Sequence, residues 1–265
     1  MWQLFVDRDL LLNGMTDMVR IVNKKVGQTP LECIDEIKKN EPKLVHLPLT
    51  YAGRLDPLAK GLLLILVGDE CHKKDEYLAL SKEYEVTILF GFETDTYDVM
   101  GKIIGQKDTE ELNNYEMLEN ILPQFTGRIR QAYPPYSSRT VLGKPLFKWA
   151  REGKINEITI PSHDVFVEKI EMIKQEKING DKLLNKIKGD ISKVKGDFRQ
   201  TDIINIWKDV LNEKKEQEFN TVTLRISCGS GVYVRGLAHD LGHALKIPAL
   251  ALEIIRTKVG EYEIN

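Results

Sequence analysis

Asp56 is the residue of this chain best suited to covalent chemistry. It lies in segment 53–61, which has a glycine at each end and comes directly before the apolar run 62–67. A carboxylate held at the mouth of a buried strand can act as a nucleophile that forms a covalent intermediate. Asp-Pro is also a common way to begin a turn or cap a helix, so these residues alone leave both interpretations open.

Two further groups could take part in chemistry at a site. Arg235 follows an expected strand and could pair with a buried carboxylate, although a surface arginine at the start of a helix is the commoner case. His239 and His243 have the i,i+4 spacing of a metal-binding pair. Residue 240 is an aspartate, no HExxH pattern is present, and no third ligand is obvious nearby. We therefore predict no metal.

The remaining patterns favour neither a thiol nucleophile nor a bound cofactor. Cys71 and His72 lie in a charged helical stretch without an orienting partner, so we interpret them as structural. The glycines form neither GxGxxG nor a P-loop, so we predict no nucleotide cofactor. The three cysteines (Cys33, Cys71 and Cys228) are odd in number and form no CxxC pair. This spacing argues against a disulfide framework and fits the cytoplasm.

The composition is that of a globular protein without a strong charge bias. In 265 residues, 42% are hydrophobic and 29% charged, and the net charge is −2. Any nucleic-acid footprint must therefore be a local basic patch. The run 62–67 is too short to cross a bilayer, and residues 1–5 show no signal-peptide pattern, so we expect no membrane association.

The elements that must position these residues alternate between strands and helices. We predict strands at 18–22, 62–67, 84–90 and 221–227, and one flanked by Gly101 and Gly105. We predict helices at about 30–39, with a capping box from Thr29 to Glu32, at 69–80, at 145–152, and over the periodic residues from Val234 to Leu245. Asp108 and Thr109 should cap another helix carrying Leu112, Leu118 and Ile121, and 128–139 should be extended because it contains Pro134-Pro135.

Segment 170–218 is rich in Lys, Asp, Glu and Asn with intermittent apolar spacing. We interpret it as a largely helical insertion within one domain. Hairpin-like strand pairs outnumber βαβ units, so the predicted class is α+β with a mixed or antiparallel sheet.

Five segments, taken together and in order, resemble the motifs of the TruB family of tRNA pseudouridine synthases. They are GRLDPLAKGLL at 53–63, KEY at 82–84 with FGFETDTYDVMG at 90–101, QAYPPYSS to AREG at 131–153, SCGSGVYVR with DLG at 227–242, and RTKVG at 256–260. The resemblance implies a pseudouridine synthase fold: one catalytic domain over 1–265, with a mixed, mainly antiparallel central sheet flanked by helices and loops.

The resemblance also implies a mechanism. Uracil would be flipped out of the RNA, detached from C1′, rotated and rejoined through C5, without metal or cofactor. Asp56 would be the nucleophile at either C1′ or C6. Tyr84 would stack on the uracil, and Arg235 would pair with Asp56 and keep it ionised. Tyr233 and Leu241 would line the pocket.

The implied substrate is tRNA, at position 55 of the TΨC arm. A basic surface would bind its phosphates, and we assign further substrate contacts to this set: Arg139, Lys144, Lys148, Arg151, Tyr51, Arg54 and Arg256. We expect a cytoplasmic monomer with no obligatory protein partner.

Three departures from the family pattern keep two alternatives open. Tyr51 stands where the family usually has histidine, and Arg54 matches the RLD motif of the RluA- and RsuA-type synthases. The chain ends soon after Arg256, so we expect no PUA domain. A same-fold synthase acting on another RNA site is one alternative, and a catalytically idle RNA-binding or RNA-folding protein is the other. The presence of Asp56, Tyr84 and Arg235 together favours an enzyme.

Overall fold

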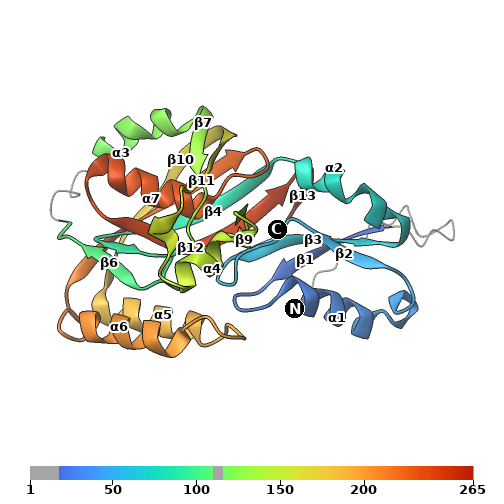
Figure 1. Cartoon of the computed structure of the whole chain (residues 1–265), viewed down its shortest axis with the longest axis horizontal. Helices are drawn as coiled ribbons and strands as arrows, with labels where there is room; N and C mark the ends of the chain where they lie inside the picture. Colours follow the sequence, from blue (N-terminus) through green and yellow to red (C-terminus); the bar gives the residue numbers. More distant parts are fainter. Residues whose placement is uncertain (1–17, 110–115, 265) are drawn as a thin grey trace.

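A curved nine-stranded sheet runs through the molecule (Figure 1). The computed structural model describes residues 18–109 and 116–264. The strands are β1 (Met18–Lys24), β2 (Leu49–Ala52), β3 (Lys60–Val67), β4 (Lys82–Phe90), β7 (Gly127–Ala132), β10 (Ser162–Asn179), β11 (Glu218–Cys228), β12 (Ala249–Val259) and β13 (Tyr262–Glu263).

The order across the sheet is β1-β3-β12-β4-β11-β10-β7, with β2 paired to β3 and β13 to β12. Only the β3–β12 pairing is parallel among the described strands. This confirms the prediction of an α+β fold with a mixed, mainly antiparallel sheet. Two small hairpins accompany the sheet, β5 (Phe92–Thr94) with β6 (Ile103–Gln106), and β8 (Thr140–Val141) with β9 (Lys144–Pro145).

Seven α-helices lie in the described residues. They are α1 (Pro30–Asn40), α2 (Lys74–Ala79), α3 (Glu116–Ile121), α4 (Leu146–Arg151), α5 (Gly180–Ile191), α6 (Gln200–Asn212) and α7 (Val234–Leu245). Short 3-10 turns lie at Pro42–Leu44, Gly68–Lys73, Leu122–Phe125 and Ile155–Glu157. The predicted capping box of α1 is confirmed, because the Thr29 hydroxyl accepts from Glu32 N and the Glu32 carboxylate accepts from Thr29 N.

Strand β3 is buried on both faces, as its uninterrupted apolar run predicts. Leu63, Ile65 and Val67 pack with buried residues of α1, whereas the alternate leucines pack with Val259 and the half-buried residues around α2. Side chains alternate across a strand, so a strand covered on both sides must be apolar at every position. The buried strand fixes where the loop before it, which carries Asp56, can lie.

The centre of the sheet is covered on one face by α7 and on the other by α5 and α6. Val86, Ile88 and Phe90 of β4 pack with Leu237 and Leu241 of α7. The opposite face packs against the hairpin of α5 and α6, which lies along the lower edge in Figure 1. Burial of Arg235 at the first turn of α7 is a consequence of this docking.

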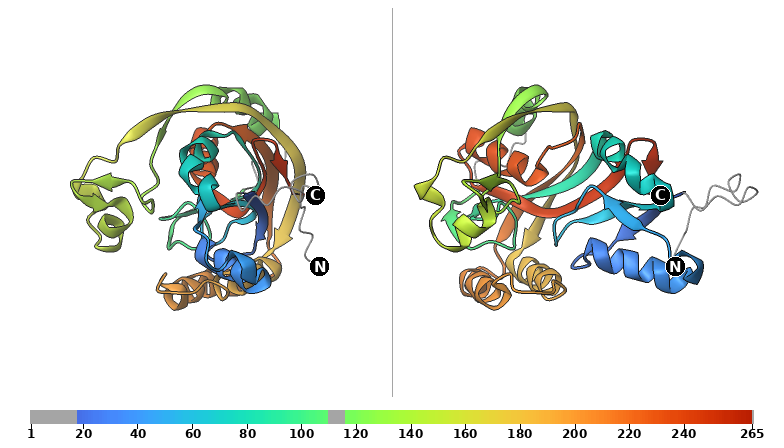
Figure 2. Two further views of the ribbon diagram at one scale, coloured as in Figure 1. Left: turned by 90° about the vertical axis from the view of Figure 1, so that its right-hand side faces the viewer. Right: turned by 45° about the vertical axis from the view of Figure 1, so that its right-hand side comes forward.

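Residues 133–153, which we call the arm, connect β7 to the segment before β10 and include α4. Figure 2 shows α4 and its hairpin projecting away from the central sheet. The arm contacts the rest of the molecule through a few aromatic and ionic groups. One of these is Tyr133, whose ring lies 4.1 Å from that of His163.

Three predicted elements differ from the structure, whereas the strand expected between Gly101 and Gly105 is confirmed as β6. Residues 69–80 form a 3-10 turn followed by the short helix α2. Leu112 lies outside the described residues, and α3 covers Leu118 and Ile121. Segment 170–218 is helical only from residue 180, because residues 170–179 continue β10 and pair with β11. The strand was not predicted because most of its side chains are exposed and charged, so the sequence shows no clear apolar alternation there.

Candidate active site

Asp56 lies at the edge of a cleft of about 220 Å³ between the loop before β3 and the loop before α7. The cleft lining includes Arg54, Asp56, Tyr84, Tyr233, Arg235 and Arg256. The structure therefore brings together six predicted site residues from four separate sequence segments. A larger hollow of about 400 Å³, between α1 and Lys193–Lys195, has none of these six in its lining.

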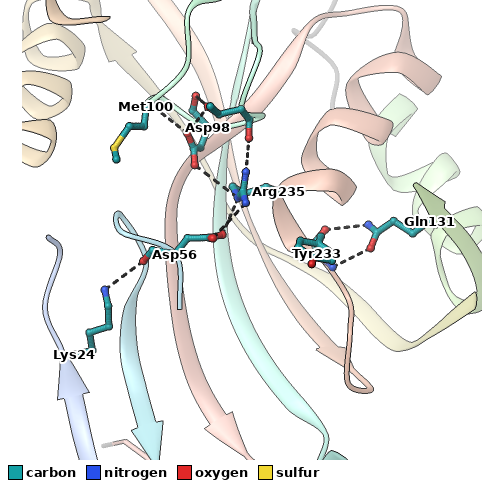
Figure 3. Close-up of polar contacts among 8 residues, drawn as sticks. Lys24, Asp56, Asp98, Met100, Gln131, Tyr233 and Arg235 are labelled. Carbon is teal, nitrogen blue, oxygen red and sulfur yellow. Dashed lines mark hydrogen bonds and ion pairs between the residues drawn. The ribbon is translucent and has the colours of Figure 1, made fainter. Parts of the chain in front are cut away.

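The carboxylate of Asp56 is held by Arg235 through two hydrogen bonds (Figure 3). Nε donates to Oδ2 at 2.7 Å and Nη2 donates to Oδ1 at 3.3 Å. The side chain of Arg235 is only 4% exposed, whereas that of Asp56 is 42% exposed. A buried guanidinium thus orients a carboxylate that remains open to a reactant. The pairing predicted from the two motifs is confirmed.

A second carboxylate, Asp98, holds Arg235 from the other side. Its Oδ2 lies 3.7 Å from Nε of Arg235, and Nη1 of Arg235 donates to the backbone carbonyl of Thr96 at 2.5 Å. Oδ1 of Asp98 accepts from the Thr96 hydroxyl at 2.6 Å and from Met100 N at 2.9 Å. Burial raises the pKa of Asp98, and the adjacent Arg235 opposes that rise. Asp98 is a positioning residue that sequence reasoning left without a role.

Two carboxylates, those of Asp56 and Asp98, balance the positive charge of Arg235. Burial lowers its pKa, but the carboxylates of Asp56 and Asp98 outweigh burial and raise the pKa above its ordinary value. Arg235 therefore stays charged at every pH at which the protein is folded. The site combines one fully paired buried cation with one accessible anion.

The loop carrying Asp56 is fixed from beneath by two buried cations. Nζ of Lys24, on β1, donates to the backbone carbonyls of Ala59 at 2.5 Å and Asp56 at 3.3 Å. Arg256, on β12, donates through Nε to Leu62 O at 2.7 Å and through Nη2 to Gly53 O at 2.9 Å. These bonds hold both ends of the loop to the sheet.

Glycine is required where that loop enters β3. Gly61 has a φ of +105°, and a Cβ there would lie 2.3 Å from the carbonyl oxygen of Arg256. Any side chain would push β3 away from β12 at the only parallel pairing described in the sheet. The glycine at the end of the motif thus permits the close approach that places Arg256 under the loop.

Lys24 is a site residue that sequence reasoning missed. Burial lowers its pKa to about 8, because the low-polarity surroundings penalise the charged ammonium. Its backbone-carbonyl partners satisfy the ammonium when it is charged. Arg20, Val22 and Lys24 alternate along β1 and are all buried on one face. This alternation was the sequence pattern that could have indicated the burial of Lys24.

Tyr84 and Tyr233 form walls of the cleft. Tyr84 projects from β4, and burial raises the pKa of its hydroxyl, so the phenol stays neutral at physiological pH. The backbone of Tyr233 is clamped by Gln131, whose amide accepts from Tyr233 N at 2.9 Å and donates to Tyr233 O at 3.0 Å (Figure 3). Gln131, in the motif at 131–153, had no predicted role.

Two predicted pocket residues lie elsewhere. Leu241 is fully buried in the core beneath α7, so the prediction that it lines the pocket is wrong. Leu241 lies on the face of α7 that packs against the sheet. Tyr51 on β2 packs with the α1 cluster and lies under the ammonium of Lys74 at 5.1 Å. Its register opposite Ile65 turns it towards α1, away from the cleft lining.

Arg256 lines the cleft but is 1% exposed, and it donates to the backbone carbonyls of Leu62 and Gly53. It supports the Asp56 loop, and burial leaves it little surface for a direct substrate contact. We therefore assign Arg256 to positioning the Asp56 loop, in place of the predicted contact with the substrate. Arg54, in contrast, is exposed at the cleft edge, where a phosphate or base could reach it.

The four predicted phosphate-binding residues all lie on the arm. Lys148 and Arg139 are exposed, and the Arg139 guanidinium lies 5.1 Å from the ring centre of Tyr133. Lys144 pairs with Glu152 at 2.7 Å and lies over Trp149. Arg151 donates to the backbone carbonyl of Asp197, which joins the arm to the α5–α6 hairpin.

The histidine pair has a third potential ligand that sequence reasoning missed. Glu93 on β5 places Oε1 3.0 Å from His239 Nε2 and 3.3 Å from His243 Nε2. The prediction of no metal relied on the absence of such a group, and that premise is wrong. Glu93 is distant in sequence, and no local pattern marked it. Cys71 donates to the backbone carbonyls of Pro48 and Leu66, which agrees with a structural role.

None of the helices within 18–109 and 116–264 has the length and apolarity needed to cross a bilayer.

Comparisons with known proteins identify the family that the chain resembles. Residues 48–196 match the model of the TruB family pseudouridylate synthase (N terminal domain). The chain is 31% identical to tRNA pseudouridine synthase B of Nostoc sp., over 92% of this chain and 68% of that protein. It is 27% identical to tRNA pseudouridine synthase 4 of Schizosaccharomyces pombe, over 100% of this chain and 83% of that protein.

Among solved structures, the fold is similar to a chain in a Cbf5-Nop10-Gar1 complex. The TM-score is 0.56 at 18% identity, covering 94% of this chain and 50% of that chain. A chain in an H/ACA RNP bound to a substrate RNA containing 2′-deoxyuridine has a TM-score of 0.53 at 18% identity, covering 94% of this chain and 49% of that chain. This chain thus spans about half the length of both structural relatives. At this identity the likeness concerns the fold.

Proposed function

The chain belongs to the TruB family of pseudouridylate synthases, and we propose that it converts a uridine of tRNA to pseudouridine with Asp56 as the nucleophile. The observation that carries this proposal is the paired but accessible carboxylate of Asp56. It is oriented by a buried arginine at the edge of a cleft lined by Tyr84 and Tyr233. An aspartate that only stabilised a turn would have no reason to be 42% exposed or to lie at the edge of a cleft.

The reaction is an isomerisation, so its atoms balance without a co-reactant. The bond between uracil N1 and ribose C1′ breaks, a bond between C5 and C1′ forms, the proton on C5 is lost, and N1 gains a proton. Asp56 would form a transient ester with ribose C1′ or add to uracil C6, and either route uses the same carboxylate. Release of the carboxylate regenerates the enzyme.

Arg235 would act on the reaction through Asp56. Its two hydrogen bonds fix both carboxylate oxygens and so orient the nucleophile. Asp98 and the Thr96 carbonyl hold Arg235 in place. Lys24 and Arg256 would fix the position of the Asp56 loop relative to Tyr84, through their hydrogen bonds to the loop backbone.

The cleft volume supports a single extruded base as the group that enters. At about 220 Å³ it is smaller than the roughly 300–1,000 Å³ of sites for drug-sized ligands. A base in a structured RNA loop must be flipped out to reach Asp56. Tyr84 would then stack on the uracil, because aromatic faces bind bases with little sequence demand.

We assign position 55 in the TΨC arm as the target, by analogy with the relatives named tRNA pseudouridine synthase B. Arg139, Lys148 and the other cations of the arm would bind phosphates beside the flipped base. A net charge of −2 is compatible with this arrangement, since the binding cations are gathered on one segment.

The chain would act as one catalytic domain that carries the α5–α6 hairpin as an insertion, and as a monomer with no obligatory protein partner. A cytoplasmic location accords with the two buried cysteines, Cys33 and Cys228, which form no disulfide. The hairpin supports the site: Arg199 pairs with Asp95 at 2.8 Å, and Asp95 also accepts from Tyr136 of the arm at 3.1 Å.

The test is pseudouridine formation in a tRNA transcript, measured by nucleoside analysis. Wild-type protein should modify the transcript, and a transcript in which only U55 is replaced by C should stay unmodified. Asp56→Asn should keep the fold and RNA affinity but lose turnover, because an amide cannot supply the attacking carboxylate. Asp164→Asn, the same change at an exposed position on β10, is the matched control.

Residual turnover of Asp56→Asn within tenfold of wild type would sink the assignment of the nucleophile. Modification of the U55C transcript would redirect the target to another uridine. Tight tRNA binding by the wild type without any pseudouridine would favour an RNA-binding or RNA-folding protein instead.

A further inference from the structure

Three side chains that could ligate a metal ion converge between β5 and α7. Glu93 comes from β5, whereas His239 and His243 lie one turn apart on α7. One donor atom from each lies within 4.8 Å of the other two. The two imidazole rings face each other with centroids 4.2 Å apart. The nucleophile, its arginine and the basic arm do not account for this cluster.

The hydrogen-bonding pattern calls for a cation at the cluster. Nδ1 of His239 lies 3.2 Å from the carboxylate of Asp240, and a neutral ring that donates to Asp240 carries its proton on Nδ1. Nε2 then carries a lone pair, and it faces the lone pairs of Glu93 Oε1 at 3.0 Å. Two such atoms repel each other unless a proton or a metal ion lies between them.

The distances between the Glu93 oxygen and the two histidine nitrogens fit a small tetrahedral metal ion. Metal–ligand bonds of 2.0–2.1 Å to imidazole nitrogen and carboxylate oxygen place neighbouring ligand atoms about 3.3 Å apart in a tetrahedron. The Glu93 oxygen lies 3.0 Å and 3.3 Å from the two Nε2 atoms. A histidine whose other nitrogen donates to a carboxylate is the usual outer-shell arrangement of a bound zinc. Asp240 supplies that carboxylate for His239.

We propose that Glu93, His239 and His243 form a binding site for a divalent transition-metal ion, with zinc as the best match. Two imidazoles and one carboxylate suit zinc, while magnesium and calcium prefer all-oxygen shells. Water would complete the coordination on the open side, where the His243 side chain is 59% exposed. The site is independent of the proposed reaction.

The position of the site gives a metal ion a structural consequence. The ring of Tyr97 stacks on His239 at 3.8 Å, and Tyr97 lies between Thr96 and Asp98, which hold Arg235. A metal ion would join α7, which carries Arg235, to β5 just ahead of that turn. It would therefore stabilise the relative placement of the two segments that orient Arg235.

The experiment uses the full chain stripped with EDTA and titrated with zinc chloride, followed by calorimetry and thermal unfolding. We expect one saturable zinc equivalent, and a rise in Tm of about 5–10 °C at zinc hundredfold above Kd. Cobalt(II) should give the visible absorption of a tetrahedral ion at the same site. His243→Ala, at an exposed position, and Glu93→Gln should each weaken zinc binding at least about 100-fold, because a lost ligand cannot be replaced.

Asp240→Asn should weaken binding about tenfold or more, because Asp240 orients His239 without touching the metal. His72→Ala is the control for adventitious binding beside Cys71. The proposal is overturned by any of three results: no saturable zinc binding by wild type, wild-type affinity in His243→Ala or Glu93→Gln, or loss of binding in His72→Ala.

Discussion

The floor of the cleft and the arm both carry cations, but they hold them in different ways. What we call the floor consists of Arg235 and Arg256 in the cleft lining and Lys24 beneath the Asp56 loop. All three are buried, and each donates to two or more fixed oxygen atoms. Arg139 and Lys148 on the arm are exposed to solvent. The first group comes from β1, α7 and β12, and the second from a segment that projects away from the sheet (Figure 2).

Burial decides what each group of cations can do. Removing one partner of a buried ion pair costs about 3–5 kcal/mol, because the other charge is left without solvent or partner. Exposed pairs contribute about 0–1 kcal/mol and are screened by salt. Cations of the floor therefore fix geometry, whereas those of the arm remain available for phosphates. Substitutions in the two regions should differ in size and in their response to pH and salt.

Arg235→Ala should have the largest effect. It removes the orientation of Asp56 and leaves Asp98 buried without its cation, so turnover should fall by orders of magnitude and unfolding should become easier by about 3–5 kcal/mol. Burial already raises the pKa of Asp98, and loss of Arg235 raises it further. A carboxyl group with a raised folded pKa loses stability as pH rises through that pKa, so the variant should be less destabilised at pH 5 than at pH 8.

Urea unfolding at both pH values measures this effect, with Arg225→Ala as the control. Arg225 lies on β11 and forms a half-exposed pair with Glu85 at 2.9 Å, so its loss should cost about 1 kcal/mol or less at either pH. Equal destabilisation by the two variants would erase the distinction between buried and exposed arginines.

Lys24→Met tests a buried cation of the floor that titrates. The pKa of Lys24 is lowered from 10.5 to about 8, so the unfolded chain binds more protons between these values and the lysine's contribution to stability rises with pH. Relative to Lys24→Met, the wild type should gain about 2 kcal/mol between pH 7 and pH 9.5. The substitution should also lower turnover, because the carbonyls of Asp56 and Ala59 lose their common donor.

Denaturation curves of wild type and Lys24→Met at both pH values give the difference in their free energies of unfolding. Contributions from other titrating groups are the same in both proteins and drop out of this difference. Lys82, whose pKa burial also lowers to about 8, remains in both proteins. A difference that stays constant between pH 7 and pH 9.5 would show that Lys24 is not buried as described.

Lys148→Ala tests the arm. If Lys148 contacts a phosphate, tRNA affinity should fall a few-fold and the slope of log K against log salt should flatten by about 0.7–0.9. The free energy of unfolding should not change, because the side chain is exposed. Lys39→Ala on α1 is the control and should leave the slope as it is. A salt slope identical to wild type would remove Lys148 from the interface.

Arg199→Ala should have a small effect and concerns the α5–α6 hairpin. Arg199 pairs with Asp95 and lies 4.6 Å from the ring centre of Tyr136, so its loss should loosen the arm and cost about 1 kcal/mol. Turnover at subsaturating tRNA should fall a few-fold with an unchanged salt slope, while a flatter slope would mean that the hairpin itself binds phosphate. Lys208→Ala on α6, exposed and distant from the arm, separates these outcomes.

Several features of the fold could be predicted because the signal was local. The apolar run of β3, the capping box of α1 and the 3.6-residue spacing of α7 each define an element without reference to the rest of the chain. Asp56, Arg235 and Tyr84 could be selected because they lie in distinctive motifs. Leu241 could not be placed correctly, since the same helix presents one face to the cleft and another to the core.

By itself, the sequence determined the family, the α+β class and the pairing of Asp56 with Arg235, because these depend on residue types in short segments. Only the tertiary structure decided how that pair is held. Lys24, Asp98 and Glu93 act through contacts with residues 32 to 150 positions away. Such contacts leave no periodic trace in the chain, because a buried charge is selected by the atoms that surround it in space and not by its neighbours in sequence.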